Sequence, residues 1–147
     1  MPTEVVINSI NGTKFGQQVL TGNHVLFGDE PIDAGGTDIG PTPYEHLLAA
    51  LGTCTSITLR MYAERKEWDL GKVTLRLNHE RIHAKDCEDC ETRAGMLDQI
   101  TTEIQFGGEL DESQTRRLLE IAKKCPVHQT LSSAVKIQTE LGSFSGG

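Results

Sequence analysis

The sequence has 147 residues, the length of one domain that can bury a hydrophobic core without disulfide bonds. Apolar residues make up 37% and charged residues 24%, which is the balance of an ordinary globular protein. The net charge is −7 and no basic stripe is visible, so binding to the phosphate backbone of nucleic acids is unfavourable.

The sequence also lacks the signals of membrane and secreted proteins. Its longest wholly apolar run, residues 47–51, is far shorter than the roughly 20 residues that cross a bilayer. Residues 1–4 do not have the basic and apolar regions of a secretory signal. We therefore expect a soluble, cytoplasmic protein without a membrane or nucleic-acid partner.

The N-terminal part of the chain predicts a small antiparallel meander followed by a long loop. Strand-forming residues alternate over residues 1–28, with turns at Asn11-Gly12 and residues 21–23. Residues 29–43 are rich in glycine, proline and aspartate. A loop of this length inside a compact domain is usually functional or wraps around a neighbouring subunit.

A long helix is predicted from about Tyr44 to Lys66, with Thr42 as its N-terminal cap. Plotted at 100° per residue, most of its apolar side chains fall within an arc of about 120°, and others widen this arc. These side chains are Leu47, Ala50, Leu51, Cys54, Ile57, Thr58 and Met61, with Leu48, Leu59 and Tyr62 beside them. We expect this helix to be buried on most sides and to form the centre of the fold.

Three further strands are predicted in the second half of the chain. Alternating apolar residues indicate strands over residues 73–77, 100–106 and 135–141. The acidic segment 86–91 separates the first two. Together with the predicted helices, these strands give an α+β fold class in a single domain, residues 1–147.

Two shorter helices precede the last predicted strand. Asp111 and Gln114 resemble a capping box, and apolar residues then repeat at helical spacing as far as Cys125. Pro126 interrupts this helix and suits the first turn of a new one over residues 127–133.

Cys54 and Cys125 are the first candidates for chemistry. Cys54 by itself is typical of a small apolar core residue. Cys125 follows Lys123 and Lys124 and precedes a helix N-terminus, and both features favour the thiolate. If folding brings the two thiols together, one can attack a peroxide and the other can condense with the resulting sulfenic acid to a disulfide. The apolar neighbours of Cys54 favour an alkyl or lipid hydroperoxide.

Two motifs that contain these cysteines resemble the OsmC/Ohr family of thiol peroxidases. They are residues 35–54, GGTDIGPTPYEHLLAALGTC, and residues 125–131, CPVHQTL. The order of elements is similar over nearly the whole chain, and the likeness is greatest to an OsmC-like subgroup whose activity is less settled. The resemblance implies an OsmC-like fold, with antiparallel sheets around a long buried central helix. It also implies an intertwined homodimer with two active sites at its interface.

The resemblance makes Cys54 the peroxide-attacking residue and Cys125 the resolving residue, which reverses the order that the local charges suggest. The family's peroxidases have a glutamate ten residues before the attacking cysteine, where this sequence has Tyr44; Glu45 lies nine residues before Cys54. Nine or ten residues of helix rise about 14–15 Å, so either side chain would serve the partner subunit's site. The family also has an arginine near the N-terminus, for which Lys14 is the candidate substitute here.

These observations predict a cysteine-based peroxidase that reduces organic hydroperoxides in the defence against oxidative stress. An external dithiol would regenerate it, and no cofactor or metal is expected. Because the family's glutamate and arginine are not matched, the activity is expected to be weak. The alternative is a non-catalytic module on the same fold that binds a small hydrophobic ligand.

The local pair Cys87 and Cys90 has three interpretations. With His83 it provides three zinc ligands, but no obvious fourth ligand lies nearby. It also fits a redox disulfide, although the flanking carboxylates would raise the thiol pKa values and slow attack. The interpretation that we favour is an acidic surface loop with inert thiols.

Overall fold

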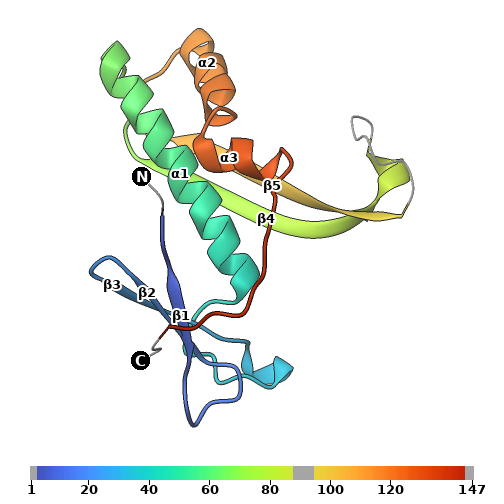
Figure 1. Ribbon diagram of the computed structural model, residues 1–147. Coiled ribbons are helices and arrows are strands. Elements are labelled where there is room, and N and C mark those ends of the chain that lie inside the picture. The colour runs from blue at the N-terminus through green and yellow to red at the C-terminus, as the bar shows by residue number, and fades with distance from the viewer. Residues whose placement is uncertain (1–2, 88–94, 145–147) are drawn as a thin grey trace. The chain divides into compact units, whose positions relative to one another are not determined.

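The computed structural model describes residues 3–87 and 95–144 and has the predicted α+β class (Figure 1). In chain order its elements are β1 (Val6–Ser9), β2 (Gln17–Thr21), β3 (His24–Gly28), η1 (Ile32–Ala34), α1 (Pro43–Lys66), β4 (Val73–His83), η2 (Ala84–Asp86), β5 (Met96–Phe106), α2 (Glu112–Ala122) and α3 (Pro126–Leu131). None of the helices in the described ranges is both long and apolar enough to cross a membrane.

Contacts between residues divide the chain into two compact units. The first unit comprises Met1–Leu47 with Lys136–Gly147, and the second comprises Leu48–Val135. α1 begins in the first unit and continues into the second. Both candidate cysteines, Cys54 and Cys125, belong to the second unit.

The first unit contains the predicted meander. β2 lies between β1 and β3 and pairs antiparallel with both, with Val6 opposite Leu20 in the first pair. Gly12 and Gly22 lie in the connecting turns with φ values of 88° and 55°, a backbone conformation that residues with a Cβ atom rarely adopt. The strands and turns predicted for this part of the chain are confirmed.

One buried carboxylate organises the loop between β3 and α1. Asp29 is 3% exposed. It accepts hydrogen bonds from the backbone amides of Glu30, Thr37 and Ile39 at 2.7, 3.1 and 3.3 Å, and from the Thr37 hydroxyl at 2.5 Å. The hydrogen bond from the Thr37 hydroxyl, together with those from the amides, lowers the pKa of Asp29 against the opposing effect of burial. The long loop is therefore held in one defined conformation.

Gly36 lies so close to this loop backbone that we expect Gly36→Ala to destabilise the fold. A Cβ atom at this position would lie 1.9 Å from the backbone oxygen of Glu30. We expect the free energy of unfolding, measured by urea denaturation, to fall by about 3 kcal/mol. Gly28→Ala is the matched control, because a Cβ atom there would meet only ordinary contacts at 3.5 Å or more. Equal stability of the two variants would contradict this prediction.

α1 begins with a capping box. Thr42 Oγ1 accepts a hydrogen bond from the backbone amide of Glu45 at 3.3 Å, and the Glu45 carboxylate accepts one from the amide of Thr42 at 2.8 Å. Pro43 occupies the first helical position, where its missing N–H is not needed, and Arg65 and Lys66 lie in the last turn near the helix carbonyls. The predicted helix and its Thr42 cap are confirmed.

Only one stripe of α1 is buried. Apart from Gly52, its buried residues recur every four positions, and they are Leu51, Thr55, Leu59 and Ala63. Ile57 and Met61, which the apolar arc placed in the interior, are 56% and 62% exposed. The expectation that this helix is buried on most sides is therefore wrong for the single chain, because full burial is confined to Gly52 and this four-residue stripe.

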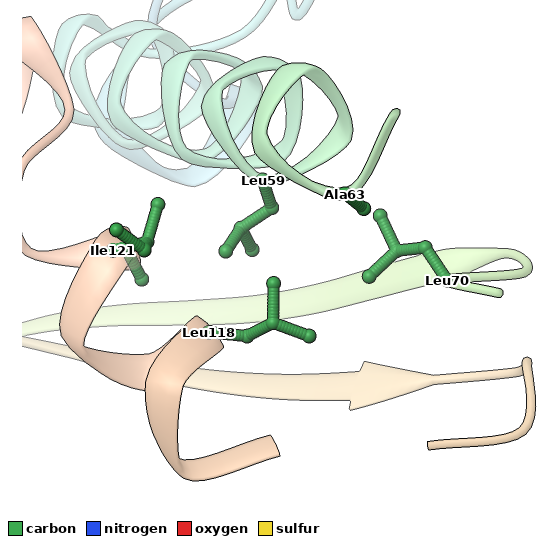
Figure 2. Close-up of a cluster of buried hydrophobic side chains, with 6 residues drawn as sticks. Leu59, Ala63, Leu70, Leu118 and Ile121 are labelled. Carbon is green, nitrogen blue, oxygen red and sulfur yellow. The ribbon is translucent and has the colours of Figure 1, made fainter. Parts of the chain in front are cut away.

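In the second unit, β4 and β5 form a long antiparallel ribbon (Figure 1). The register runs from Val73 opposite Phe106 to His83 opposite Met96, so both strands are longer than predicted. Side chains from α1, α2 and the segment before β4 form the main core, and they point toward one another above the ribbon (Figure 2). The core residues are Leu59, Ala63, Leu70, Leu118, Ile121 and Ala122.

α2 and α3 follow the ribbon and confirm the two predicted short helices. The Asp111 carboxylate accepts a hydrogen bond from the amide of Gln114 at 2.7 Å, and the Gln114 side chain accepts one from the amide of Asp111 at 2.9 Å. α2 ends at Ala122, shortly before the predicted end at Cys125. Pro126 begins α3, and Cys125 is its N-cap residue.

The prediction of a final strand over residues 135–141 is wrong for the single chain, because no strand is present in residues 132–144. Val135, Ile137 and Leu141 are 54%, 83% and 101% exposed. Alternation of apolar residues gives a segment one apolar face, but a strand also needs a neighbour that shares its hydrogen bonds. Within the described ranges, no backbone hydrogen bond joins residues 134–144 to another strand.

Candidate active site

The second unit brings the thiols of Cys54 and Cys125 together. Cys54 lies in the middle of α1 and is partly exposed, whereas Cys125 lies between α2 and α3 and is 0% exposed. The Cys54 sulfur has three hydrogen-bonding neighbours: the Cys125 thiol, the backbone amide of Val127 and the Thr58 hydroxyl. Both cysteines are free thiols. Two residues that are distant in sequence therefore form one dithiol site with one accessible and one buried sulfur.

Hydrogen bonds fix the position of the buried thiol. The backbone amide of His128 donates to Cys125 Sγ at 3.3 Å, which caps the N-terminus of α3. Thr55 Oγ1 lies 3.6 Å from the same sulfur and also donates to the carbonyl oxygen of Leu51 at 2.9 Å. Because the Thr55 proton is engaged with Leu51, the thiol proton of Cys125 is free to point at the Thr55 oxygen. Cys125 is therefore held from two sides beside Cys54.

The surroundings of Cys54 favour the protonated thiol. Burial raises the pKa of Cys54, the hydrogen bond from the Val127 amide lowers it, and the adjacent Cys125 thiol raises it again. The Thr58 hydroxyl makes a smaller opposing contribution. The result is a pKa above the ordinary value for cysteine, so only a small fraction of Cys54 is thiolate at neutral pH.

Sequence reasoning did not identify Thr55, Thr58 or Val127 as part of the site. Thr58 follows Cys54 by one helical turn, so helical spacing alone could have found it. Thr55 lies in the buried stripe between Leu51 and Leu59, but the apolar arc did not include it. Val127 contributes through its backbone amide, which no side-chain pattern can reveal.

The three predicted supporting residues belong to the first unit, and the structure assigns none of them to the dithiol. The Glu45 carboxylate takes part in the capping box of α1. Lys14 is exposed, with its Nζ 5.1 Å from the ring centroid of Phe15, and Tyr44 is 55% exposed. Catalytic support from Lys14, Tyr44 and Glu45 stays a prediction.

Cys87 takes part in a disulfide, which differs from the inert thiol that the sequence favoured. Cys90, with which Cys87 forms the local pair in the sequence, lies outside the described residues. In the described ranges, no group of three or more histidine, cysteine or acidic side chains is arranged to hold a metal ion. The disulfide interpretation is therefore the one that fits Cys87, and its redox role stays a prediction.

Two cavities of the second unit are lined in part by residues that contact Cys54 or Cys125. The larger, of about 820 Å³, contains Thr58 in its wall and continues along α1 past Met61 to Arg65. The smaller, of about 300 Å³, is lined by Thr55 and His128, the two residues that contact Cys125. Neither Cys54 nor Cys125 itself lines these two cavities.

The model of the family described as OsmC-like protein matches residues 35–140, which include both cysteines and the helix that carries Cys54. The chain belongs to the OsmC-like family. No curated protein shows a significant sequence match to it. The family match confirms the resemblance that the two cysteine motifs indicated.

Solved structures with the same fold include other members of this OsmC-like group. A putative osmotic stress induced and detoxification response protein from Psychrobacter arcticus has a TM-score of 0.68 and 20% identity, over 88% of each chain. An organic hydroperoxide resistance protein OsmC from Legionella pneumophila has a TM-score of 0.64 and 16% identity, over 90% of each chain. The organic hydroperoxide resistance protein OhrB of Bacillus subtilis has a TM-score of 0.54 and 17% identity, over 90% of this chain and 91% of its own. At these identities the likeness shows the α+β fold alone.

Proposed function

We propose that this OsmC-like protein is a cysteine-based peroxidase that reduces organic hydroperoxides in the defence against oxidative stress. The observation that carries the proposal is the dithiol itself, in which an accessible Cys54 lies beside a buried Cys125. A peroxide can approach only the accessible sulfur, which supports Cys54 as the attacking residue and Cys125 as the resolving residue. The organic hydroperoxide resistance proteins among the solved structures support the same function.

The reaction follows from the arrangement of the two thiols. The Cys54 thiolate attacks the terminal oxygen of the hydroperoxide; an S–O bond forms, the O–O bond breaks and the alcohol leaves with a proton. The Cys125 thiol then attacks the Cys54 sulfenic acid, an S–S bond forms and water leaves. An external dithiol reduces this disulfide by two exchange steps and is itself oxidised to a disulfide. Each turnover therefore consumes one hydroperoxide and one dithiol.

Oxidation of the reduced protein with one equivalent of cumene hydroperoxide tests this proposal. We expect peptide mass spectrometry to find a disulfide between Cys54 and Cys125, because the two thiols are hydrogen-bonding neighbours. The matched control is the Cys125→Ser variant, in which Cys54 should be trapped as a sulfenic acid by dimedone. An unchanged number of free thiols after peroxide treatment would rule the peroxidase function out.

We also propose that the working form is a homodimer. The first unit buries no apolar side chain: in the described ranges its buried residues are Gly16, Gly28 and Asp29. Apolar residues on its sheet and on the C-terminal segment are exposed instead, among them Ile7, Val25, Ile137 and Leu141. A three-stranded sheet without a covered face is unstable in water, and a second copy of the chain would cover it.

Light scattering coupled to size-exclusion chromatography should therefore give about twice the mass of the 147-residue chain at micromolar concentration. Ile137→Asp would place a charge on this exposed apolar segment and should shift the protein toward monomer. Lys136→Asp, at the neighbouring exposed polar position, is the control. A monomeric wild-type protein would contradict the dimer.

A non-catalytic module that binds a small hydrophobic ligand is the second candidate. The raised pKa of Cys54 and the presence of Tyr44 where the family's peroxidases have glutamate favour it. Ligand binding without any peroxide-dependent thiol loss would support this function over the peroxidase. For either function we propose a cytoplasmic location, where free thiols such as Cys54 and Cys125 persist, and cell fractionation tests it.

A further inference from the structure

Thr55 is a buried polar side chain beside the dithiol that neither step of the proposed reaction uses. It follows Cys54 directly in α1 and is 3% exposed, yet its hydroxyl contacts the other cysteine. Thr55 Oγ1 lies 3.6 Å from Cys125 Sγ and donates to the carbonyl oxygen of Leu51 at 2.9 Å. A buried polar group that bridges the backbone and a reactive thiol constrains where the protons of the site lie.

The hydrogen bond to Leu51 fixes the direction of the contact between Thr55 and Cys125. A threonine hydroxyl has one proton and two lone pairs. Because the proton is donated to Leu51, the hydroxyl can only accept from Cys125. The proton in the contact between Thr55 and Cys125 is therefore the thiol proton of Cys125.

The Cys125 proton has a choice between two acceptors. In residues 3–87 and 95–144, the hydrogen-bonding neighbours of the Cys125 sulfur are the Thr55 hydroxyl, the His128 amide and the Cys54 thiol. The amide of His128 is itself a donor, so only the Thr55 oxygen and the Cys54 sulfur can accept. Oxygen accepts more strongly than sulfur. The proton therefore points at Thr55, and a lone pair of the Cys125 sulfur faces Cys54.

This orientation completes a chain of hydrogen bonds with one direction. The Cys54 thiol donates to Cys125, Cys125 donates to Thr55, and Thr55 donates to the carbonyl of Leu51. Each bond polarises the next one and strengthens it. The pKa of Cys54 agrees with this direction: burial raises it most, and Cys125 raises it further, as a neighbour that accepts the Cys54 proton does.

We propose that Thr55 is a positioning residue that holds the thiol proton of Cys125 away from Cys54. For its catalytic consequence this proposal rests on the peroxidase function. The lone pair that faces Cys54 is the one that attacks when Cys54 has become a sulfenic acid. The S–S bond forms, the S–O bond breaks, and the thiol proton joins the leaving oxygen as water. Thr55 acts through Cys125 and takes no part in the bonds that form or break.

The titratable side chains around the dithiol stay the same when Thr55 is changed. Lys123 and His128 line the smaller cavity together with Thr55, and Lys124 lines the larger one. The side chains of β5 that line the smaller cavity are not titratable, and they are Ile100, Thr102 and Ile104. A difference between Thr55 variants therefore reports the hydroxyl and not a change in nearby charge.

The pH dependence of Cys54 alkylation by iodoacetamide, followed by peptide mass spectrometry, tests the proposal without peroxide. Thr55→Val removes the hydroxyl and keeps the shape of the side chain. The Cys125 proton should then turn to the Cys54 sulfur and stabilise its thiolate. We expect the midpoint of the alkylation profile to fall by about 0.7 pH unit, which corresponds to an about fivefold larger thiolate fraction at pH 7. Thr55→Ser keeps the hydroxyl and should restore the wild-type midpoint.

Thr53→Val is the matched control. It makes the same substitution on the other side of Cys54 in α1, at an exposed hydroxyl that donates to the carbonyls of Ala49 and Ala50 at 2.9 and 3.2 Å. We expect it to keep the wild-type midpoint. An unchanged or higher midpoint in Thr55→Val, or an equal fall in Thr55→Ser, would overturn the role of Thr55 and leave the peroxidase function intact. The expected fall in a protein without peroxide turnover would reject the peroxidase function alone.

Infrared spectroscopy of the S–H stretch gives a second measurement that needs no change at Thr55. The difference spectrum between Cys54→Ala and Cys54→Ala/Cys125→Ala isolates the Cys125 thiol. We expect its band at a lower frequency than that of a free thiol, because donation to the Thr55 oxygen weakens the S–H bond. A band at the free-thiol frequency would overturn the proposal even if Thr55→Val does not fold.

Discussion

Cys54→Ser should lower kcat/KM for cumene hydroperoxide by about a thousandfold or more. The sulfur of Cys54 is the accessible member of the dithiol, so no other group in the site can take over the attack on the peroxide. A serine hydroxyl has nearly the same size but is a very weak nucleophile toward an O–O bond. The peroxide concentration can be followed in an assay with excess dithiothreitol as the dithiol.

Two further variants separate the roles of the cysteines. Cys125→Ser should consume one equivalent of peroxide and then stop or slow, because the sulfenic acid of Cys54 has no internal thiol with which to condense. The double variant Cys87→Ser/Cys90→Ser is the control for the cysteines outside the dithiol, and we expect it to keep the wild-type rate. A Cys54→Ser protein as active as wild type would favour the binding module instead.

Peroxide reduction should accelerate about tenfold for each pH unit between roughly pH 6 and 8. The pKa of Cys54 is raised, mainly by burial, so in this interval the thiol is mostly protonated. Below the pKa, the thiolate fraction grows tenfold with each unit of pH, and the thiolate is the form that attacks. The rate at which wild type consumes peroxide in a single turnover measures this dependence, because the resolving step consumes no peroxide.

The pH profile also tests whether the groups around Cys54 within one chain account for its pKa. Val127→Pro would remove the backbone N–H that lowers the pKa of Cys54, and the profile should shift further toward alkaline pH. Val127→Ala keeps this N–H and serves as the control. A wild-type rate that is already constant above pH 6 would contradict the raised pKa and would require a charge that the first unit or a second subunit supplies.

Local chemistry explains why much of the fold could be predicted. The turn at Asn11-Gly12, the capping boxes that begin α1 and α2, and Pro126 at the start of α3 depend on residues within a few positions of one another. Such features can be predicted because the residues that form them are close together in the sequence. The two motifs around Cys54 and Cys125 likewise identified the family, because each motif is a continuous segment.

The two wrong predictions, the burial of α1 on most sides and the strand over residues 135–141, have a different origin. The apolar arc on α1 and the alternation in residues 135–141 describe which side chains avoid water but not which neighbour covers them. In the single chain Ile57 and Ile137 have no such cover and remain exposed. A prediction from apolar periodicity therefore assumed partners that this chain does not provide from its own elements.

By itself the sequence determined the order of the observed strands and of the three α-helices, the family, and Cys54 and Cys125 as the candidate thiols, because local patterns along the chain encode all of these. Only the tertiary structure decided that Cys54 is partly exposed and Cys125 buried, that Thr55 contacts Cys125, and that the amide of Val127 contacts Cys54. These properties depend on how α1 packs beside α2 and α3. Burial, pKa and charge in a cavity are set by neighbours in space, and no spacing along the chain encodes them directly.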